Sequence, residues 1–359
     1  MRFGLGPMTL ESVRGWRCAG CRKPQDGGCC GRKQVDIYEE VLEYATTAEW
    51  WGFDSVWVDE RYFTPDSFNS SASVVAAGLS QRTDYIRIGM MPVLGLVNAI
   101  YVAEEAACVD NINAGRTIVA GQVPDDETVR GWAGSGAANS VARIIDDVAV
   151  LRKSWGPNPF SHHSEFHNIP MNSEVHVEAR GLDRISVQPK PAQLDMPLWM
   201  AGGAVAAEVA RTLGLPFMAP AHLSLGQLKP LYEGLNSTYE RIVPLVRDVY
   251  VAPTNAEAER LASGAIRDLY SAQIRAGLEL TNSQFDDLVR QTIIVGDPDT
   301  CIERLYAYER ELGVNYVIAR LAYHNMHPGD TARAIQLFGQ GVVPEFRMFG
   351  LPDEIRKVV

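Results

Sequence analysis

The feature that most constrains this chain is a regular alternation of short apolar or β-branched runs with longer segments of helical period. Strands that alternate with helices favour a parallel sheet, and eight such units favour a single (βα)8 TIM barrel. An open doubly wound sheet is the alternative, but no GxGxxG motif follows the first run. The eight expected strands are Phe3–Met8, Ser55–Val58, Ile86–Met91, Thr117–Gly121, Leu198–Ala201, Phe217–Ala219, Asp248–Val251 and Tyr316–Ala319.

Several local signals mark where the helices between these strands begin and end. Gly52 and Gly313 each stand just before a strand, where glycine takes the left-handed conformation that ends a helix. Thr254 and Glu257 have the spacing of a capping box. Asp297 precedes a proline in the first turn of another expected helix. These signals support the alternation.

Two connections are longer than the others, and both are expected as insertions in one domain that spans residues 1–359. The first, residues 9–33, follows the first strand and should lie over the carboxyl ends of the strands, where barrel enzymes keep their active sites. The second, residues 155–197, lies between the fourth and fifth strands. Its four histidines lack a clear ligand spacing and are interpreted as part of a solvated loop: His162, His163, His167 and His176.

Charge and composition exclude several classes of protein. The net charge is −11, which disfavours nucleic-acid binding. The sequence shows neither an uninterrupted apolar stretch of membrane-spanning length nor a signal peptide, so we expect a cytoplasmic protein that binds no membrane. Residues 9–33 reverse the sign, with six basic residues against two acidic ones, and could close over an anionic ligand.

Residues 9–33 also contain four of the six cysteines: Cys18, Cys21, Cys29 and Cys30. Four thiolates can hold zinc, but the second pair is adjacent and does not form a CxxC motif. Disulfides or free thiols are therefore favoured over a metal site. The three tryptophans Trp50, Trp51 and Trp57 are expected to pack in the core, and Arg116 is expected to be structural.

Several segments, taken together and in order, resemble the bacterial luciferase-like flavin-dependent monooxygenase family. The resemblance covers almost the whole chain. Its clearest piece begins at Asp54 and reads DSVWVDERYF. The other segments are AEEAACVD from Ala103, NAGR from Asn113, QPKP from Gln188, PLWMAGG from Pro197, VGDP from Val295 and LGV from Leu312.

The resemblance implies a (βα)8 barrel with a flavin at the carboxyl ends of its strands. It implies a monooxygenase in which reduced FMN and dioxygen form a C4a-peroxyflavin that oxygenates a small organic substrate. It also implies a separate flavin reductase as a partner, and a homodimer or a heterodimer with a related barrel. Two alternatives stay open: hydride transfer with the deazaflavin coenzyme, and a non-catalytic subunit that stabilises an active partner.

The resemblance and the strand ends together select the candidate site residues. Catalytic roles fall to Glu60, His222 and His324, since carboxylate and imidazole groups at a barrel mouth can move protons. For Glu60 the alternative is a structural ion pair with Arg61, and for each histidine a bond to a carbonyl. The cofactor residues are Met91, Gln122, Gly202, Gly203 and Ala204; the substrate residues are Arg61, Tyr62, Tyr323, Arg14 and Arg17.

The sequence departs from the family at the places that usually hold the flavin phosphate. Arg61 stands where the family often has histidine. The end of the fourth strand and the residues after it read AGQVP from Ala120 and lack the usual arginine. The turn after the fifth strand, Gly202 to Ala206, lacks the usual serine or threonine. If FMN binds, the missing positive charge must come from elsewhere, and Arg14, Arg17 or Arg22 of the 9–33 segment is expected to contact an anionic group of the cofactor or substrate. The alternative is a solvated loop whose charges only aid solubility.

Overall fold

The computed structural model describes residues 1–8, 34–62, 69–123, 140–170, 183–235, 242–262, 287, 289–323 and 326–348. The basic Cys-rich segment 9–33 lies outside these residues. The elements are β1 (Arg2–Leu5), α1 (Gln34–Trp50), β2 (Ser55–Asp59), α2 (Ala72–Arg82), β3 (Arg87–Met91), α3 (Ala99–Ile112), β4 (Thr117–Val123), α5 (Val141–Trp155), β5 (His162–His163), β6 (Asn168–Ile169), β7 (Leu198–Gly202), α7 (Ala204–Leu213), β8 (Phe217–Met218), α8 (Leu225–Tyr232), β9 (Pro244–Val251), β10 (Ile294–Gly296), α11 (Pro298–Leu312), β11 (Tyr316–Arg320), α12 (Pro328–Gly341) and α13 (Val343–Met348).

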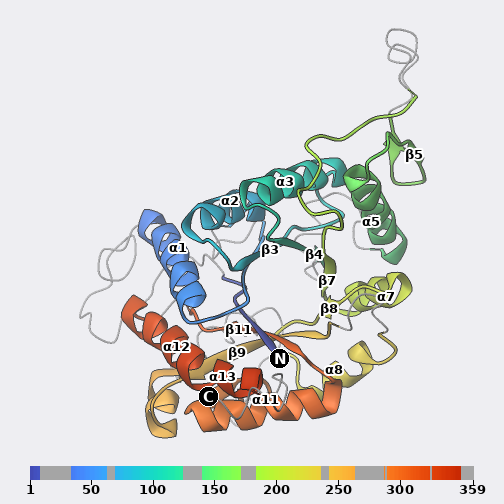
Figure 1. Cartoon of the computed structure of the whole chain (residues 1–359). Helices are drawn as coiled ribbons and strands as arrows, with labels where there is room; N and C mark the ends of the chain where they lie inside the picture. Colours follow the sequence, from blue (N-terminus) through green and yellow to red (C-terminus); the bar gives the residue numbers. More distant parts are fainter. Residues whose placement is uncertain are drawn as a thin grey trace.

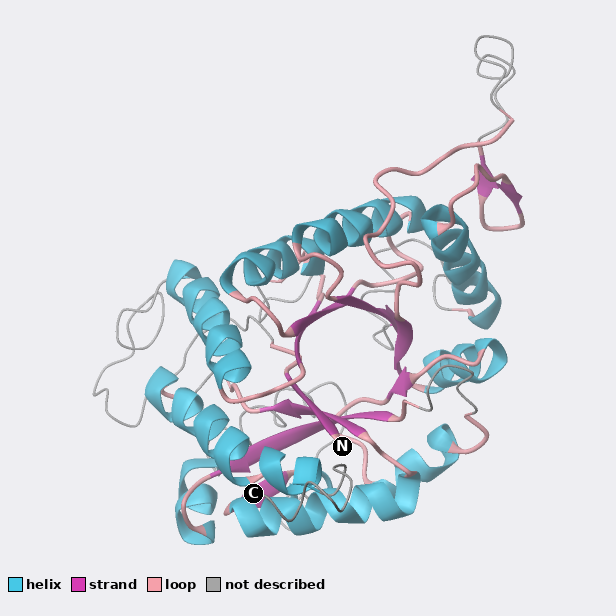
Figure 2. Ribbon diagram, viewed as in Figure 1, coloured by secondary structure: helices cyan, strands magenta, loops and turns pink. Residues whose placement is uncertain are grey.

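The main sheet is parallel and curls into a ring, with helices around its outside (Figures 1 and 2). Its order is β10-β9-β11-β1-β2-β3-β4-β7-β8. This α/β arrangement is consistent with the expected barrel, and every predicted strand lies in the sheet. Among the described elements the sheet holds one strand more than predicted, β10, which pairs with the end of β9 through Ile294 and Val249.

Two strand boundaries differ from the prediction by more than two residues. The first strand ends at Leu5 instead of Met8, because Gly6 has φ +122° and turns the chain out of the strand direction. The seventh predicted strand starts at Pro244, four residues before Asp248, since β11 pairs along that whole stretch. The helix ends follow their signals: Asp297 accepts a bond from Thr300 N at 2.9 Å, and Gly313 ends α11 in the left-handed conformation.

Side-chain hydrogen bonds join β8 to β9, the two strands that face each other where the ring comes together. The Tyr232 hydroxyl donates to Pro244 O at 2.7 Å and accepts from Ala219 N at 3.4 Å. Arg247 donates to Ala221 O at 2.9 Å and to Leu223 O at 3.0 Å. Tyr232 and Arg247 are both buried, and their bonds hold β9 to the end of β8 and the residues after it.

The apolar residues form two main layers. The larger one lies between the sheet and the helices, and the smaller one fills the inside of the ring. Trp57 is at the centre of the inner layer and is fully buried, as predicted. Gly4 and Gly89, its neighbours on β1 and β3, make room for the indole, because a Cβ at either position would lie within 3 Å of the ring. Trp50 contradicts the expectation of core packing: it is 81% exposed at the end of α1.

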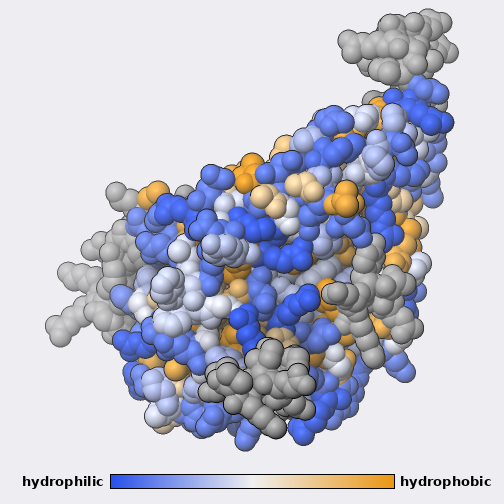
Figure 3. All heavy atoms as spheres, in the orientation of Figure 1, coloured by the Kyte–Doolittle hydropathy of each residue, from blue (hydrophilic) through white to orange (hydrophobic). Residues whose placement is uncertain are grey.

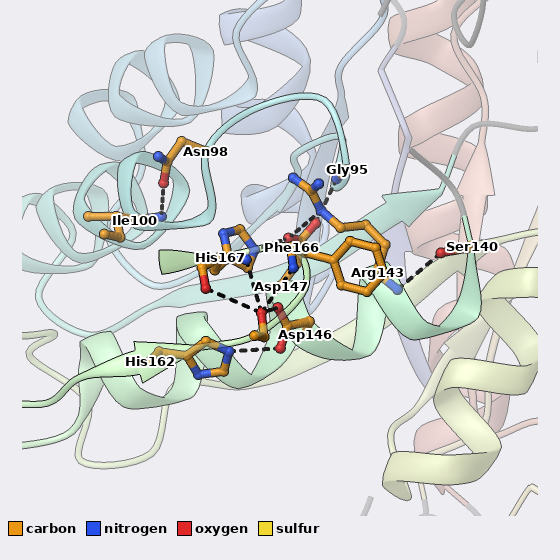
Figure 4. A network of polar contacts seen from close by, with 11 residues as sticks. Gly95, Asn98, Ile100, Ser140, Arg143, Asp146, Asp147, His162, Phe166 and His167 are labelled. Atoms are coloured by element: carbon orange, nitrogen blue, oxygen red, sulfur yellow. Dashed lines mark hydrogen bonds and ion pairs between the residues drawn. The ribbon is translucent and has the colours of Figure 1, made fainter. Parts of the chain in front are cut away.

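The predicted insertion carries the small antiparallel pair β5–β6 beside α5 (Figures 1 and 4). The interpretation of its histidines as solvated is wrong for two of them. His162 Nε2 lies 2.7 Å from Asp146 Oδ1, and His167 Nε2 lies 2.5 Å from Asp147 Oδ1, with both rings buried. Two adjacent aspartates on α5 therefore hold this hairpin in place. His163 is exposed, and His176 lies outside the described residues.

Within the described residues, every helix is too short or too polar to cross a bilayer. On the side shown in Figure 3, hydrophobic residues lie in small groups scattered among hydrophilic ones.

Candidate active site

Four polar side chains lie on the inner face of the ring, at the carboxyl ends of their strands. Alternate residues of a strand share a face, and Trp57, Ala120, Val246 and Ile318 belong to the inner apolar layer. The residues two positions further along face the same way. They are Asp59, Gln122, Asp248 and Arg320. The carboxyl ends of parallel strands are where barrel enzymes place their active sites.

Asp59 is the carboxylate with the most unusual surroundings. It is only 5% exposed. Its Oδ2 accepts a hydrogen bond from Arg61 Nε at 3.0 Å, which also forms an ion pair. Its Oδ1 is buried and has no hydrogen-bond partner among the residues that the structure describes. A buried acceptor without a donor is costly, so this oxygen is suited to receive a bond from a ligand.

Glu60 faces the other way and joins two loops. Its Oε1 accepts from Ala72 N at 3.1 Å and its Oε2 from Val93 N at 2.9 Å. Burial raises the pKa of Glu60, although these two bonds and Tyr62 oppose the shift. Burial and the neighbouring Glu60 carboxylate raise the pKa of Tyr62. Glu60 thus fixes the start of α2 and the loop after β3, while its predicted catalytic role stays a prediction.

Gln122 and Met91, the predicted cofactor contacts, lie near the carboxyl ends of β4 and β3. Met91 is buried in the inner layer at the end of β3. Gln122 Nε2 donates to the carbonyl oxygen of Glu60 at 3.1 Å. This bond ties the ends of β2 and β4 together on the inner face.

A buried ion pair spans the opposite side of the same end. Arg320 on β11 binds Asp248 on β9 through both carboxylate oxygens, with Nη2 to Oδ2 at 2.8 Å. The Asp248 side chain is fully buried. Such a pair requires exact geometry to offset desolvation, and it holds the two strand ends in register.

The turn after β7 leads into α7, whose N-terminus has no side-chain cap. Gly202 has φ +139°, and a Cβ there would lie 2.6 Å from Val123 O. Gly203 is the N-cap of α7 and makes no side-chain capping bond. The first amide groups of a helix lack partners inside the helix, and the helix dipole favours an anion beside them. A phosphate would fit these requirements.

The other predicted residues are placed as follows. Tyr323 is buried, and its hydroxyl donates to Val249 O at 3.4 Å. His222 and Ala204 are exposed. His324, Arg14 and Arg17 lie outside the described residues.

The sequence reasoning missed Asp248 and Arg320. Strand alternation could have indicated them, because each follows an apolar residue of the inner layer, Val246 or Ile318, by two positions. Their ion pair could not be predicted from local sequence, because the two residues lie 72 positions apart and meet only because β9 and β11 are neighbours in the sheet.

The insertion hairpin is connected to this end of the sheet. Asp147, which binds His167, also accepts from Gly95 N at 2.8 Å (Figure 4). Gly95 belongs to the loop after β3, as does Val93, which binds Glu60. The hairpin therefore supports a loop that borders the candidate site.

Comparison with known proteins gives a consistent family. A family model described as luciferase-like monooxygenase matches residues 23–316. The F420-dependent glucose-6-phosphate dehydrogenase of Amycolatopsis mediterranei is 23% identical, over 87% of this chain and 95% of that protein.

Solved structures share the fold. The monooxygenase RslO1 from Streptomyces bottropensis has a TM-score of 0.78 at 19% identity, over 96% of this chain and all of that one. The FMN complex of the oxygenating constituent of 3,6-diketocamphane monooxygenase from Pseudomonas putida has a TM-score of 0.70 at 18% identity, over 88% of this chain and 94% of that one.

Proposed function

Because this chain belongs to the luciferase-like monooxygenase family, we propose that it is an oxidoreductase that uses reduced FMN and dioxygen to oxygenate a small organic substrate. The observation that carries the proposal is the unpartnered Asp59 Oδ1, buried on the inner face at the carboxyl ends of the strands. The proposal also takes the sheet to close as an eight-stranded barrel, with β10 added outside it.

The residues present fit a flavin. Its phosphate would be held by the amide groups at the start of α7, beside Gly202, Gly203 and Ala204. Asp59 offers an acceptor for a ring N–H, and Gln122 and Met91 line the neighbouring strand ends. When bound, the reduced flavin supplies the electrons that activate dioxygen.

The residues of the chain bind and orient the cofactor and the substrate, and they exclude water from the site. The inner apolar layer beneath the site, which includes Ala201 and Met218, keeps that side dry. Arg61, held by Asp59, and Tyr62, beside Glu60, are proposed to contact the substrate, together with Tyr323. Glu60, His222 and His324 are the proposed proton-transfer groups, and Arg14 and Arg17 the proposed basic residues that close over an anion.

Hydride transfer with the deazaflavin coenzyme is the second candidate. It is favoured by the similar dehydrogenase of Amycolatopsis mediterranei, whose name states dependence on F420. The Asp59 acceptor and the open start of α7 suit either cofactor, because both carry a flavin-like ring and a phosphate.

Paired titrations separate the candidates. Purified full-length chain is titrated without oxygen against reduced FMN and against the reduced deazaflavin coenzyme. The proposal expects tighter binding of FMN, and oxygen uptake that rises with a substrate panel. Tighter binding of the deazaflavin coenzyme would favour hydride transfer, and binding of neither would favour a non-catalytic subunit.

The proposed partners follow from the same function. A separate flavin reductase would supply reduced FMN. A homodimer, or a heterodimer with a related barrel, is proposed to form through α2 and α3, where Val74 and Tyr101 expose 71% and 62% of their surface. Light scattering at several protein concentrations tests the assembly.

A further inference from the structure

A large cavity lies at the end of the sheet opposite to the candidate active site. Its volume is about 780 Å³, within the roughly 300–1,000 Å³ typical of sites for small molecules. Its wall is formed by the starts of the strands and by the end of α5. The residues that matter for its chemistry are Arg2, Arg87, Trp155, Leu194, Trp199 and Tyr316.

A packed aromatic layer separates this cavity from the candidate active site. The rings of Trp57 and Trp199 lie 4.9 Å apart, and those of Trp199 and Tyr316 lie 5.2 Å apart. Ser55 Oγ accepts from Trp57 Nε1 at 2.6 Å and from the Tyr316 hydroxyl at 2.7 Å. Because side chains of this layer fill the ring, a molecule in the cavity would not touch a flavin at the other end.

The cavity wall contains an arginine, Arg87, whose hydrogen bonds within the described residues go to neutral oxygens. Arg87 Nη2 donates to Gln193 Oε1 at 2.9 Å and to Thr117 O at 3.5 Å, which are both neutral oxygens. Among the described residues, no carboxylate forms an ion pair with it. Burial lowers the pKa of Arg87, and the nearby positive charge of Arg2 acts in the same direction, whereas Tyr316 and Asp110 oppose the shift. An anion between these two side chains would relieve both effects.

Two of the acidic residues of the wall, Glu49 and Asp54, are already engaged by the backbone. Glu49 accepts from the amides of Asp84, Tyr85 and Ile86 at 2.5–2.9 Å through Oε1. Asp54 Oδ2 accepts from Phe3 N at 2.8 Å. Both carboxylates therefore serve the fold, and neither forms an ion pair with Arg87 within the described residues.

We propose that this cavity is a second ligand site, which takes a planar aromatic carboxylate. The carboxylate pairs with Arg87, since a guanidinium offers the forked donors that a carboxylate matches. The ring lies among Trp155, Trp199 and Tyr316, where aromatic edges and faces supply contact area. This site does not depend on the proposed flavin chemistry, because the two lie on opposite sides of the aromatic layer.

The test is a titration of the full chain with 2-naphthoate, followed by calorimetry, with saturating FMN present. The wild type is expected to bind it. Arg87→Gln is expected to weaken binding about tenfold or more, since it removes a charge-assisted bond. Arg2→Gln, at an exposed position, gives a second variant that leaves the fold intact and is expected to weaken binding by about threefold.

Two controls keep the result specific. Arg82→Gln changes an exposed arginine outside the cavity and is expected to leave the affinity unchanged. 2-Naphthamide, the neutral amide of the same ring, is expected to bind the wild type more weakly and to be insensitive to Arg87→Gln. No binding of 2-naphthoate, binding that FMN displaces, or equal affinity for wild type and both cavity variants would each overturn the proposal.

Discussion

The indole of Trp57 packs so closely against Gly89, its partner on the neighbouring strand, that a Cβ atom at position 89 would lie 2.2 Å from the ring. This contact sets how the inner layer is built. The same layer supports the polar strand ends on one side and forms the floor of the cavity on the other.

Gly89→Ala is therefore expected to destabilise the protein by about 1–3 kcal/mol, since a methyl group in a filled core forces its neighbours to move. Urea unfolding measures the change. Gly226→Ala in α8 is the matched control: nothing lies within 4 Å of its Cβ, so its stability should stay the same or rise slightly. A Gly89→Ala protein as stable as wild type would contradict this packing.

The join between β8 and β9 depends on the Tyr232 hydroxyl. Tyr232→Phe removes that hydroxyl and leaves the Pro244 carbonyl without this donor in a buried place. A loss of about 1–3 kcal/mol in unfolding free energy is expected. Tyr85→Phe, at a residue that is 85% exposed, should cost nothing measurable. Equal stabilities of the two variants would show that the hydroxyl is not needed at the join.

Asp146 makes the insertion hairpin sensitive to acid. Burial alone would raise its pKa, but the bonds from Ser164 and His162 outweigh burial and lower it from the usual 3.8. An acid with a lowered pKa in the folded state stabilises that state above its unfolded pKa. The contribution disappears as the pH falls through the lowered value.

The stability lost in Asp146→Asn should therefore be largest between about pH 5 and 7 and should shrink below about pH 3.8. Thermal unfolding of both proteins over this range measures the difference. Glu208→Gln, which removes an exposed helix-surface ion pair, serves as the comparison and should show a small change throughout. A difference for Asp146→Asn that does not vary with pH would argue against the lowered pKa.

Asp59→Asn tests the unpartnered oxygen. Because Oδ1 has no partner in the described residues, removing the charge should change the free energy of unfolding by less than about 1 kcal/mol, apart from the weakened bond to Arg61. Affinity for reduced FMN should fall by about tenfold, because a charge-assisted acceptor is lost. Flavin binding that survives the change would remove Asp59 from the cofactor site.

Much of this fold could be predicted from the sequence because its signals are local. The apolar runs, Gly313 and Asp297 mark strands and helix ends within a few residues of themselves. The boundaries that were wrong depend on neighbours: Pro244 joins its strand because β11 pairs with it, and β10 exists because β9 extends past β11.

The site was predictable in part for the same reason. Gln122 and Gly202 stand at strand ends that the sequence marks, and the structure places both at the carboxyl end of the sheet. Strand alternation distinguishes Asp59 from Glu60, but only after an inward residue such as Trp57 is known. The pairs His162–Asp146 and His167–Asp147 were missed, since no local pattern places a hairpin against a helix.

The central claim is that the carboxyl end of this sheet holds a flavin by its phosphate at the start of α7. Its most direct test is an oxygen-free titration of wild type and Gly203→Asp with reduced FMN and with reduced riboflavin, which lacks the phosphate. The aspartate can cap the helix but repels a phosphate, so FMN affinity should fall at least about tenfold while riboflavin affinity stays constant. Equal FMN affinity in both proteins, or no FMN binding by the wild type, would contradict the claim.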